Sequence, residues 1–150
     1  MELHKGNHSV YSLQYHLVLV VKYRKRCITK EIGEFLVSES ARLLESWNGG
    51  LIEGNFESDH LHLLISMDPK YELARYVGVL KKTLSRNVRQ KYGDYLAQYL
   101  WGGSFWSDSY YIATTGGANL ETIQQYIQSQ GKPKRKYVRK QKASGDSSPL

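Results

Sequence analysis

The sequence of 150 residues has a single cysteine, Cys27, and no long apolar run. One thiol excludes an internal disulfide and a zinc site built from several cysteines, and we expect a protein of the reducing cytoplasm. A membrane-spanning helix needs about 18 apolar residues in succession, so we expect no contact with a membrane. Residues 1–5 do not resemble a secretory signal. The sequence also lacks a glycine-rich phosphate loop, so we expect no nucleotide cofactor.

Acidic residues are absent from residues 132–142, which carry seven of the 21 lysines and arginines. The other 14 face 13 acidic residues within residues 1–131, so that part of the chain is almost neutral. We therefore expect one domain, residues 1–131, followed by a basic, disordered tail, residues 132–150. Such a tail suits a polyanion such as nucleic acid, and a solvated terminus without a partner explains it equally well.

Hydrophobic periodicity predicts four strands and three helices. Strands are expected at residues 10–24, at 51–56, from 60 to the Asp68-Pro69 break, and at 110–115. Helices are expected at residues 30–47, 72–91 and 119–130, with an aromatic, glycine-bearing loop at 92–109. This order predicts an α+β, ferredoxin-like (RRM-like) fold. Its antiparallel four-stranded sheet carries two helices on one face, and a C-terminal helix bearing a tyrosine follows.

The third strand contains a His60-Leu61-His62 sequence. Side chains alternate along a strand, so both histidines share one face while Leu61 and Leu63 share the face covered by helices. Two imidazoles spaced about 7 Å apart along a strand can converge on one divalent ion. Two half-exposed histidines on a sheet surface are the plain alternative. Asp59 adjoins the pair and is expected to point to the other face.

The last expected helix supplies a nucleophile and an oxygen ligand. Tyr126 and Gln130 are four residues apart, so they lie on one side of that helix. The helix has little apolar surface and is expected to lie across the open sheet face of its own chain or of a partner. Gln130 can then add an oxygen to the two imidazoles, a ligand set that suits Mg²⁺ or Mn²⁺. An aromatic residue packed on the sheet is the alternative for Tyr126.

These features together resemble the single-tyrosine HUH transposases, small prokaryotic insertion-sequence enzymes that move single-stranded DNA. The resemblance extends over residues 9–130. Its motifs are His60-Leu61-His62, Phe105-Trp106-Ser107-Asp108-Ser109-Tyr110-Tyr111, Ala113-Thr114-Thr115-Gly116-Gly117 and Tyr126-Ile127-Gln128-Ser129-Gln130.

The resemblance implies a role for each matching residue. His60, His62 and Gln130 would bind the metal ion, Tyr126 would be the nucleophile, and Gly116-Gly117 would be the hinge of its helix. It also implies a homodimer in which each tyrosine helix completes the partner's site. The substrate would be single-stranded DNA with subterminal hairpins, cleaved and rejoined through a 5′-phosphotyrosine. The protein would work in the prokaryotic cytoplasm, at the nucleoid when bound to DNA.

Basic residues beside aromatic ones are the candidates for DNA contacts. Tyr23 is a candidate for base stacking. The candidates for phosphate contacts are Lys22, Arg24, Arg26, Lys81, Lys82, Arg86 and Arg89. A solvated charged face explains most of this set equally well.

Two other functions are open at this stage. One is a related single-tyrosine HUH nickase that acts on replication origins or genomic hairpin repeats. The other is a non-enzymatic RNA-binding module on the same fold, which predicts exposed aromatic side chains on the central strands, with Tyr11 and Tyr15 as candidates.

Overall fold

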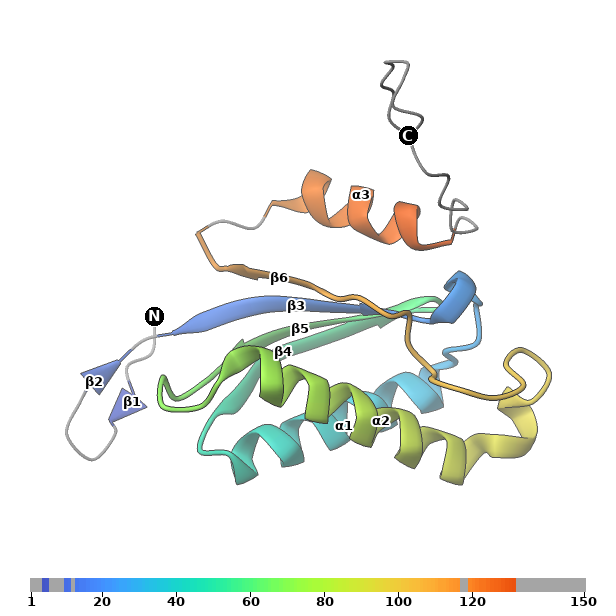
Figure 1. The fold of residues 1–150 in the computed structure, drawn as a ribbon, viewed down its shortest axis with the longest axis horizontal. Coiled ribbons are helices and arrows are strands. Elements are labelled where there is room, and N and C mark those ends of the chain that lie inside the picture. Colours follow the sequence, from blue (N-terminus) through green and yellow to red (C-terminus); the bar gives the residue numbers. More distant parts are fainter. Residues whose placement is uncertain (1–3, 6–9, 12, 117–118, 132–150) are drawn as a thin grey trace, which may run out of the picture.

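A four-stranded antiparallel sheet organises the chain (Figure 1). The structure is a computed structural model that describes residues 4–5, 10–11, 13–116 and 119–131. The strands of the sheet, in the order β4-β5-β3-β6, are β4 (Gly50–Glu57), β5 (His60–Ser66), β3 (Gln14–Val20) and β6 (Tyr111–Thr114). The first and third strands of this sheet in chain order, β3 and β5, are therefore its central pair. This confirms the ferredoxin-like α+β prediction.

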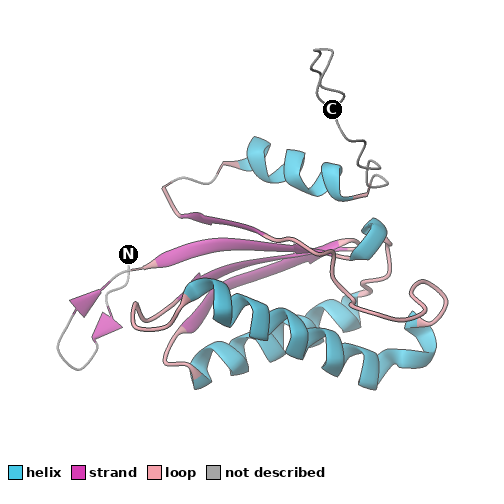
Figure 2. Ribbon diagram, in the orientation of Figure 1, coloured by secondary structure: helices cyan, strands magenta, loops and turns pink. Residues whose placement is uncertain are grey.

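Helices cover both faces of the sheet (Figures 1 and 2). The helices α1 (Lys30–Ser46) and α2 (Leu73–Leu96) pack on one face, and α3 (Leu120–Gln130) lies over the opposite face. None of the helices in the described part of the chain combines the length and apolarity needed to cross a bilayer.

The two faces of the central strands bury different side chains. Leu61 and Leu63 are fully buried in the main core between the sheet and the helices α1 and α2. On the opposite face, Val18 and Val20 of β3 form a small second core with Ile123 of α3. The prediction that Leu61 and Leu63 face the covering helices is therefore confirmed.

The register of β3 against β5 places the histidines on the α3 side of the sheet. Val18 is paired with His62 and Val20 with His60. Paired residues in antiparallel strands have side chains on the same face. Both histidines therefore lie beside the valines that α3 covers.

The prediction of a single strand at residues 10–24 is wrong, because the structure divides this range into several elements. Its first part, β2 (Val10–Tyr11), pairs with β1 (His4–Lys5) in a separate two-stranded sheet. Its last part is a short 3-10 helix, η1 (Lys22–Arg24), in which Tyr23 and Arg24 have positive φ angles of 57° and 56°. No β-strand contains that backbone conformation, so the strand ends before it.

The second helix extends further than expected. The aromatic residues and the Gly102-Gly103 pair predicted a loop from residue 92, but α2 continues to Leu96 with a kink at Tyr92. Leu96 is fully buried in the main core, so tertiary packing overrides the weak helix propensity of this segment. By contrast, the expected start of the last helix is confirmed, since the Asn119 side chain accepts a hydrogen bond from the Thr122 backbone N–H.

The RNA-binding interpretation required aromatic side chains on the open face of the central strands. Tyr15 instead packs against the main core, on the side of α1 and α2. Tyr11 belongs to β2, outside the four-stranded sheet. The central strands therefore do not carry the expected stacking platform at these two positions.

Helix α1 approaches β4 so closely that only glycine fits at position 33. A Cβ atom at Gly33 would overlap the ring of Phe56. We expect Gly33→Ala to lower the free energy of unfolding by about 1–3 kcal/mol, because the overlap forces the ring to move. Gly78→Ala in α2 is the matched control, because a Cβ there meets no atom within 4 Å, and it should stabilise by about 0.5–1 kcal/mol. Urea unfolding of both variants tests this, and equal stabilisation by the two would contradict it.

Candidate active site

His62 on β5 contacts a histidine that the sequence interpretation did not assign. The Nδ1 atom of His16, on β3, lies 2.9 Å from Nε2 of His62, and the two ring centroids are 5.1 Å apart. Burial lowers the pKa of His62, and the neighbouring His16 and His60 lower it further. His62 is therefore neutral at neutral pH, which is the form that binds a metal ion.

His60 is oriented by a carboxylate. Its Nδ1 atom lies 2.9 Å from Oδ1 of Asp59. Burial alone would raise the pKa of Asp59, but hydrogen bonds from His60 and Arg24 outweigh that effect and hold the pKa below its usual value. The ionised carboxylate therefore accepts a hydrogen bond from the Nδ1–H group, which leaves Nε2 of His60 free to act as a ligand.

The expectation that Asp59 points to the other face is wrong. Asp59 belongs to the turn between β4 and β5, where strand alternation does not apply. Its carboxylate is buried and reaches both His60 and Arg24.

The histidine pair fits a divalent ion as part of its ligand set. A histidine that binds a metal ion through one ring nitrogen commonly donates a hydrogen bond from the other nitrogen to a carboxylate, which fixes the orientation of the ring. At His62, a metal ion and His16 would compete for the same nitrogen. Within the described residues, no three His, Cys, Asp or Glu side chains gather closely enough to hold a metal ion. A complete site therefore needs oxygen ligands of another kind, such as a glutamine amide, water or a substrate phosphate.

Tyr126 lies on the β6 side of α3 and not beside the histidines. Its hydroxyl oxygen is 2.8 Å from Oγ of Ser109, and its ring centroid is 5.8 Å from that of Tyr111. Burial raises the pKa of Tyr126, although the hydrogen bond with Ser109 opposes the change. The phenol is therefore protonated at neutral pH in this position.

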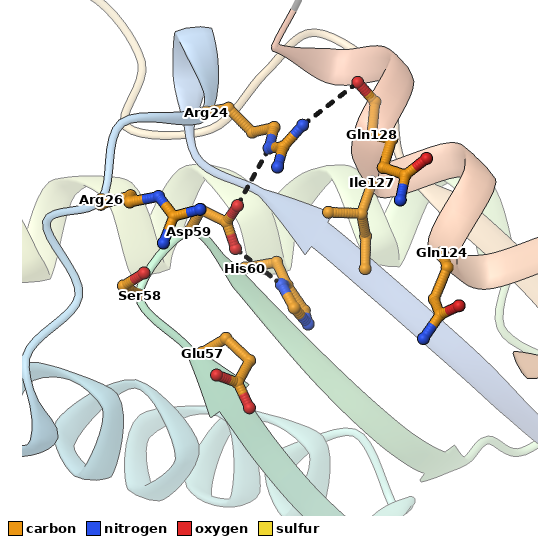
Figure 3. Close-up of a pocket in the computed structure, with 9 residues that line it drawn as sticks. All are labelled: Arg24, Arg26, Glu57, Ser58, Asp59, His60, Gln124, Ile127 and Gln128. Carbon is orange, nitrogen blue, oxygen red and sulfur yellow. Dashed lines mark hydrogen bonds and ion pairs between the residues drawn. The ribbon is translucent and has the colours of Figure 1, made fainter.

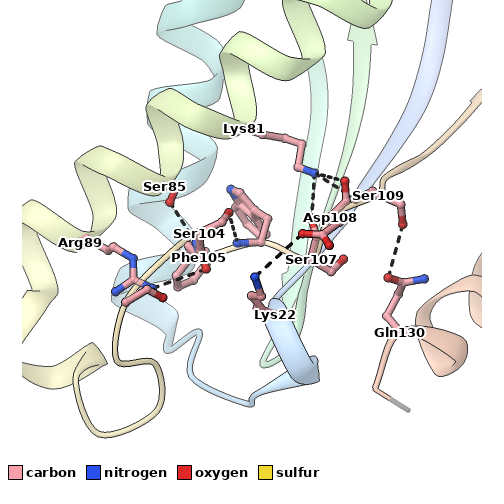
Figure 4. A network of polar contacts seen from close by, with 12 residues as sticks. Lys22, Lys81, Ser85, Arg89, Ser104, Phe105, Ser107, Asp108, Ser109 and Gln130 are labelled. Carbon is pink, nitrogen blue, oxygen red and sulfur yellow. Dashed lines mark hydrogen bonds and ion pairs between the residues drawn. The ribbon is translucent and has the colours of Figure 1, made fainter. Parts of the chain in front are cut away.

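Gln130 shares this position with Tyr126. Oγ of Ser109 lies 3.4 Å from Oε1 of Gln130, at the edge of hydrogen-bond distance (Figure 4). The amide nitrogen of Gln130 donates to Oγ of Ser129. One serine therefore contacts both functional groups of the helix.

Another side of α3 faces His60 and the turn that precedes it. A pocket of about 320 Å³ separates the β4–β5 turn from α3 (Figure 3). Its lining residues are Arg24, Arg26, Glu57, Ser58, Asp59, His60, Gln124, Ile127 and Gln128.

Helix geometry keeps the tyrosine and the histidines of one chain apart. Gln124 and Tyr126 are two residues apart and point about 200° from each other around the helix. Accordingly, the described part of the chain shows no hydrogen bond or ring contact between Tyr126 and either His60 or His62.

Several candidate DNA contacts form internal bonds. The ammonium of Lys81 donates to the backbone carbonyls of Ser107, Ser109 and Asp108, at 2.9, 3.1 and 3.3 Å (Figure 4). Burial lowers the pKa of Lys81, while Asp108 opposes the shift.

Arg89 and Lys22 support the same segment. Arg89 donates to the carbonyls of Gly102 and Ser104, and Lys22 lies 3.9 Å from the carboxylate of Asp108. Both contacts fix the chain that leads to β6.

The remaining candidates are exposed. Tyr23 is 67% exposed, and Arg26, Lys82 and Arg86 lie on the surface. Their role in DNA binding stays a prediction. Of the predicted hinge, Gly116 lies in the turn after β6, where a Cβ atom would meet no atom within 4 Å, and Gly117 lies outside the described residues.

Three residues of the site were missed at the level of the sequence. They are His16, Asp59 and Ser109. The alternation of β3 already placed His16 on the face of Val18, so its position was readable. Asp59 lies in a turn and Ser109 in a loop, and side-chain directions there do not follow the regular alternation of a strand or the periodicity of a helix.

Comparisons with known proteins agree on one family. Residues 9–130 match the family model described as IS200-like transposase. The chain is 36% identical over 131 residues to the ISDra2 transposase TnpA of Deinococcus radiodurans, covering 87% of this chain and 92% of that protein. It is 31% identical over 123 residues to the transposase for insertion sequence element IS200 of Salmonella typhimurium, covering 82% of this chain and 80% of that protein. A crystal structure assigned to a transposase of Deinococcus radiodurans R1 aligns with a TM-score of 0.76 at 30% identity, covering 85% of this chain and 97% of that chain.

Lys81 and Lys82 are neighbours with different surroundings, which makes them a matched pair. We expect Lys81→Met to lower the free energy of unfolding by about 1–3 kcal/mol, because three backbone carbonyls lose a shared charged donor. Lys82→Met should change it by less than about 0.5 kcal/mol. If Lys82 contacts phosphate, its removal should lower the salt-dependence slope of DNA binding by about 1, and Lys81→Met should not. A lower slope with unchanged stability for Lys81→Met would contradict this assignment.

Proposed function

The chain belongs to the family of IS200-like transposases, and on that premise we propose that it cleaves and rejoins single-stranded DNA at the ends of an insertion sequence. Tyr126 is the nucleophile of this proposal. The observation that supports it best is the pairing of Tyr126 and Gln130 on one side of α3, held by Ser109.

The proposed step is an in-line transfer of a phosphoryl group. The phenolic oxygen of Tyr126 forms a bond with phosphorus, and the bond from phosphorus to the 3′ oxygen breaks. The phenol loses its proton, and the departing 3′ oxygen takes one up as a hydroxyl. The product is a 5′-phosphotyrosine, which keeps a phosphodiester of similar energy. Attack by another 3′-hydroxyl therefore rejoins DNA without a nucleotide cofactor.

A divalent ion, Mg²⁺ or Mn²⁺, would supply charge stabilisation at a non-bridging phosphate oxygen. His60 and His62 would hold it together with a Gln130 amide oxygen. The surrounding structure prepares both histidines for this role. The carboxylate of Asp59 fixes the ring of His60, and burial keeps His62 neutral.

We also propose that the active site is composite between two subunits. Tyr126 and Gln130 point away from the histidines of their own chain, towards β6. In a dimer with two-fold symmetry, each subunit would supply its Tyr126 and Gln130 to the other subunit. Tyr126 and Gln130 of one subunit would then meet His60 and His62 of the other.

The proposed DNA substrate carries hairpins near the ends of the element. The exposed candidates for its backbone are Arg26, Lys82 and Arg86, with Tyr23 as the candidate for stacking on a base. The basic segment at residues 132–142 lies outside the described residues and adds a sequence-independent attraction to DNA.

The first test is formation of a covalent adduct. A single-stranded oligonucleotide from the DNA flanking the coding sequence is incubated with protein and Mg²⁺. The adduct, seen by denaturing electrophoresis, should disappear in Tyr126→Phe and on chelation of the metal. Tyr71→Phe, on the α1–α2 side of the sheet, should keep it. An adduct that survives in Tyr126→Phe would show that another residue is the nucleophile.

The second test mixes two inactive variants, His60→Ala and Tyr126→Phe. In a composite dimer, one site of each mixed dimer contains both intact groups. Random exchange therefore restores about a quarter of the wild-type sites. If each chain completes its own site, no activity returns. His60→Ala alone should bind the hairpin as wild type, and equal loss of binding would assign the histidine to the fold or to DNA.

A further inference from the structure

Arg24 joins the C-terminal end of α3 to the support of the histidine site. Its Nε donates to Oδ2 of Asp59 at 3.0 Å. Its Nη1 donates to the backbone carbonyl of Gln128 at 3.3 Å (Figure 3). The two partners are 35 and 104 residues away in the chain, so only the folded and docked arrangement brings them together.

The backbone at Arg24 adopts an unusual conformation to make these contacts. Tyr23 and Arg24 both have positive φ, which side chains other than glycine rarely adopt. Two backbone hydrogen bonds hold the conformation, from Lys22 to the carbonyl of Phe105 and from Arg24 to that of Val21. Strain of this kind is retained where the surrounding structure requires a side chain in one place.

The end of α3 rests directly on the stem of Arg24. A Cβ atom at Gly131, which follows the last helical residue, would lie 2.8 Å from Cδ of Arg24. The carbonyl of Gln128 belongs to the last turn, where carbonyls lack a partner within the helix. A guanidinium at this end also interacts favourably with the helix dipole.

Asp59 carries the connection to His60. One carboxylate oxygen accepts from Arg24 and the other accepts from Nδ1 of His60. The contacts therefore run from Gln128 through Arg24 and Asp59 to His60 without a gap.

We propose that Arg24 is a latch that couples docking of the tyrosine helix to the orientation of His60. The part that concerns the metal ion rests on the proposed function of His60. A docked α3 fixes Arg24, Arg24 fixes the carboxylate of Asp59, and Asp59 fixes the ring that presents Nε2. Such coupling is reciprocal, so metal binding at His60 strengthens docking of α3.

This assignment changes the role expected of Arg24. It is a positioning residue that acts through Asp59, and two of its donor atoms are already engaged. The exposed Arg26 on the rim of the same pocket keeps its guanidinium available to DNA.

Hydrogen exchange of the full chain, without DNA, tests the latch. Arg24→Gln should speed exchange of the backbone amides at residues 124–130 about tenfold, because a charged hydrogen bond to the helix end is lost. Asp59→Asn should act in the same direction. Lys25→Gln is the matched control, since it removes one exposed charge from the adjacent position and should leave exchange unchanged. Equal exchange in Arg24→Gln and wild type overturns the latch.

Addition of Mn²⁺ tests the coupling. Mn²⁺ should slow exchange of α3 in wild type and in Lys25→Gln but not in Arg24→Gln, and it should bind Arg24→Gln more weakly. Binding that leaves exchange of α3 unchanged in wild type overturns the coupling, as does absence of binding. Neither measurement requires DNA cleavage. A failed adduct assay would therefore contradict the proposed function, whereas hydrogen exchange alone would decide whether Arg24 is a latch.

Discussion

The antiparallel register between β3 and β5 is the constraint on which both faces of the sheet depend. It places Leu61 and Leu63 in the main core and sets His60 and His62 beside Val20 and Val18. A slip of one residue would exchange the two faces, burying imidazoles under α1 and α2 and exposing leucines. The free energy of the core therefore fixes the position of the histidines. On the proposed function, the sheet therefore holds the metal-binding histidines and the helix above it carries the nucleophile.

Helix α3 is held by few apolar contacts and by polar ones at its two sides. Ile123 is its single buried residue among those described, and Tyr126 and Ile127 are half-buried. At about 25 cal/mol for each Å² of apolar surface, such an interface contributes far less than the packing of α1 and α2. The contacts of Ser109 with Tyr126 and of Arg24 with Gln128 therefore carry much of the docking specificity. A helix attached in this way can leave its position without unfolding the domain.

Local patterns predicted the fold and the histidine pair, because alternation and helical periodicity are short-range signals. The Asn119 cap and the buried leucines of β5 followed from the same signals. The turn that aims Asp59 at His60 and the positive φ angles of Tyr23 and Arg24 did not, since no glycine or asparagine marks them. Lys81 shows the limit most clearly. Its charge suited a phosphate, yet its ammonium satisfies carbonyls that lie 26 to 28 residues further along the chain. A charge pattern cannot distinguish these partners.

Tyr126 and Gln130 occupy successive turns of one short helix and contact the same serine. Their separation is fixed by the helix, so they travel as one piece. On the proposed chemistry, a histidine pair receives its nucleophile and its third ligand in a single event or receives neither. A subunit whose helix is elsewhere holds neither a complete metal site nor an attacking group. The enzyme would thus be harmless to the many single-stranded regions of a cell until assembly on its own DNA ends supplies both parts at once.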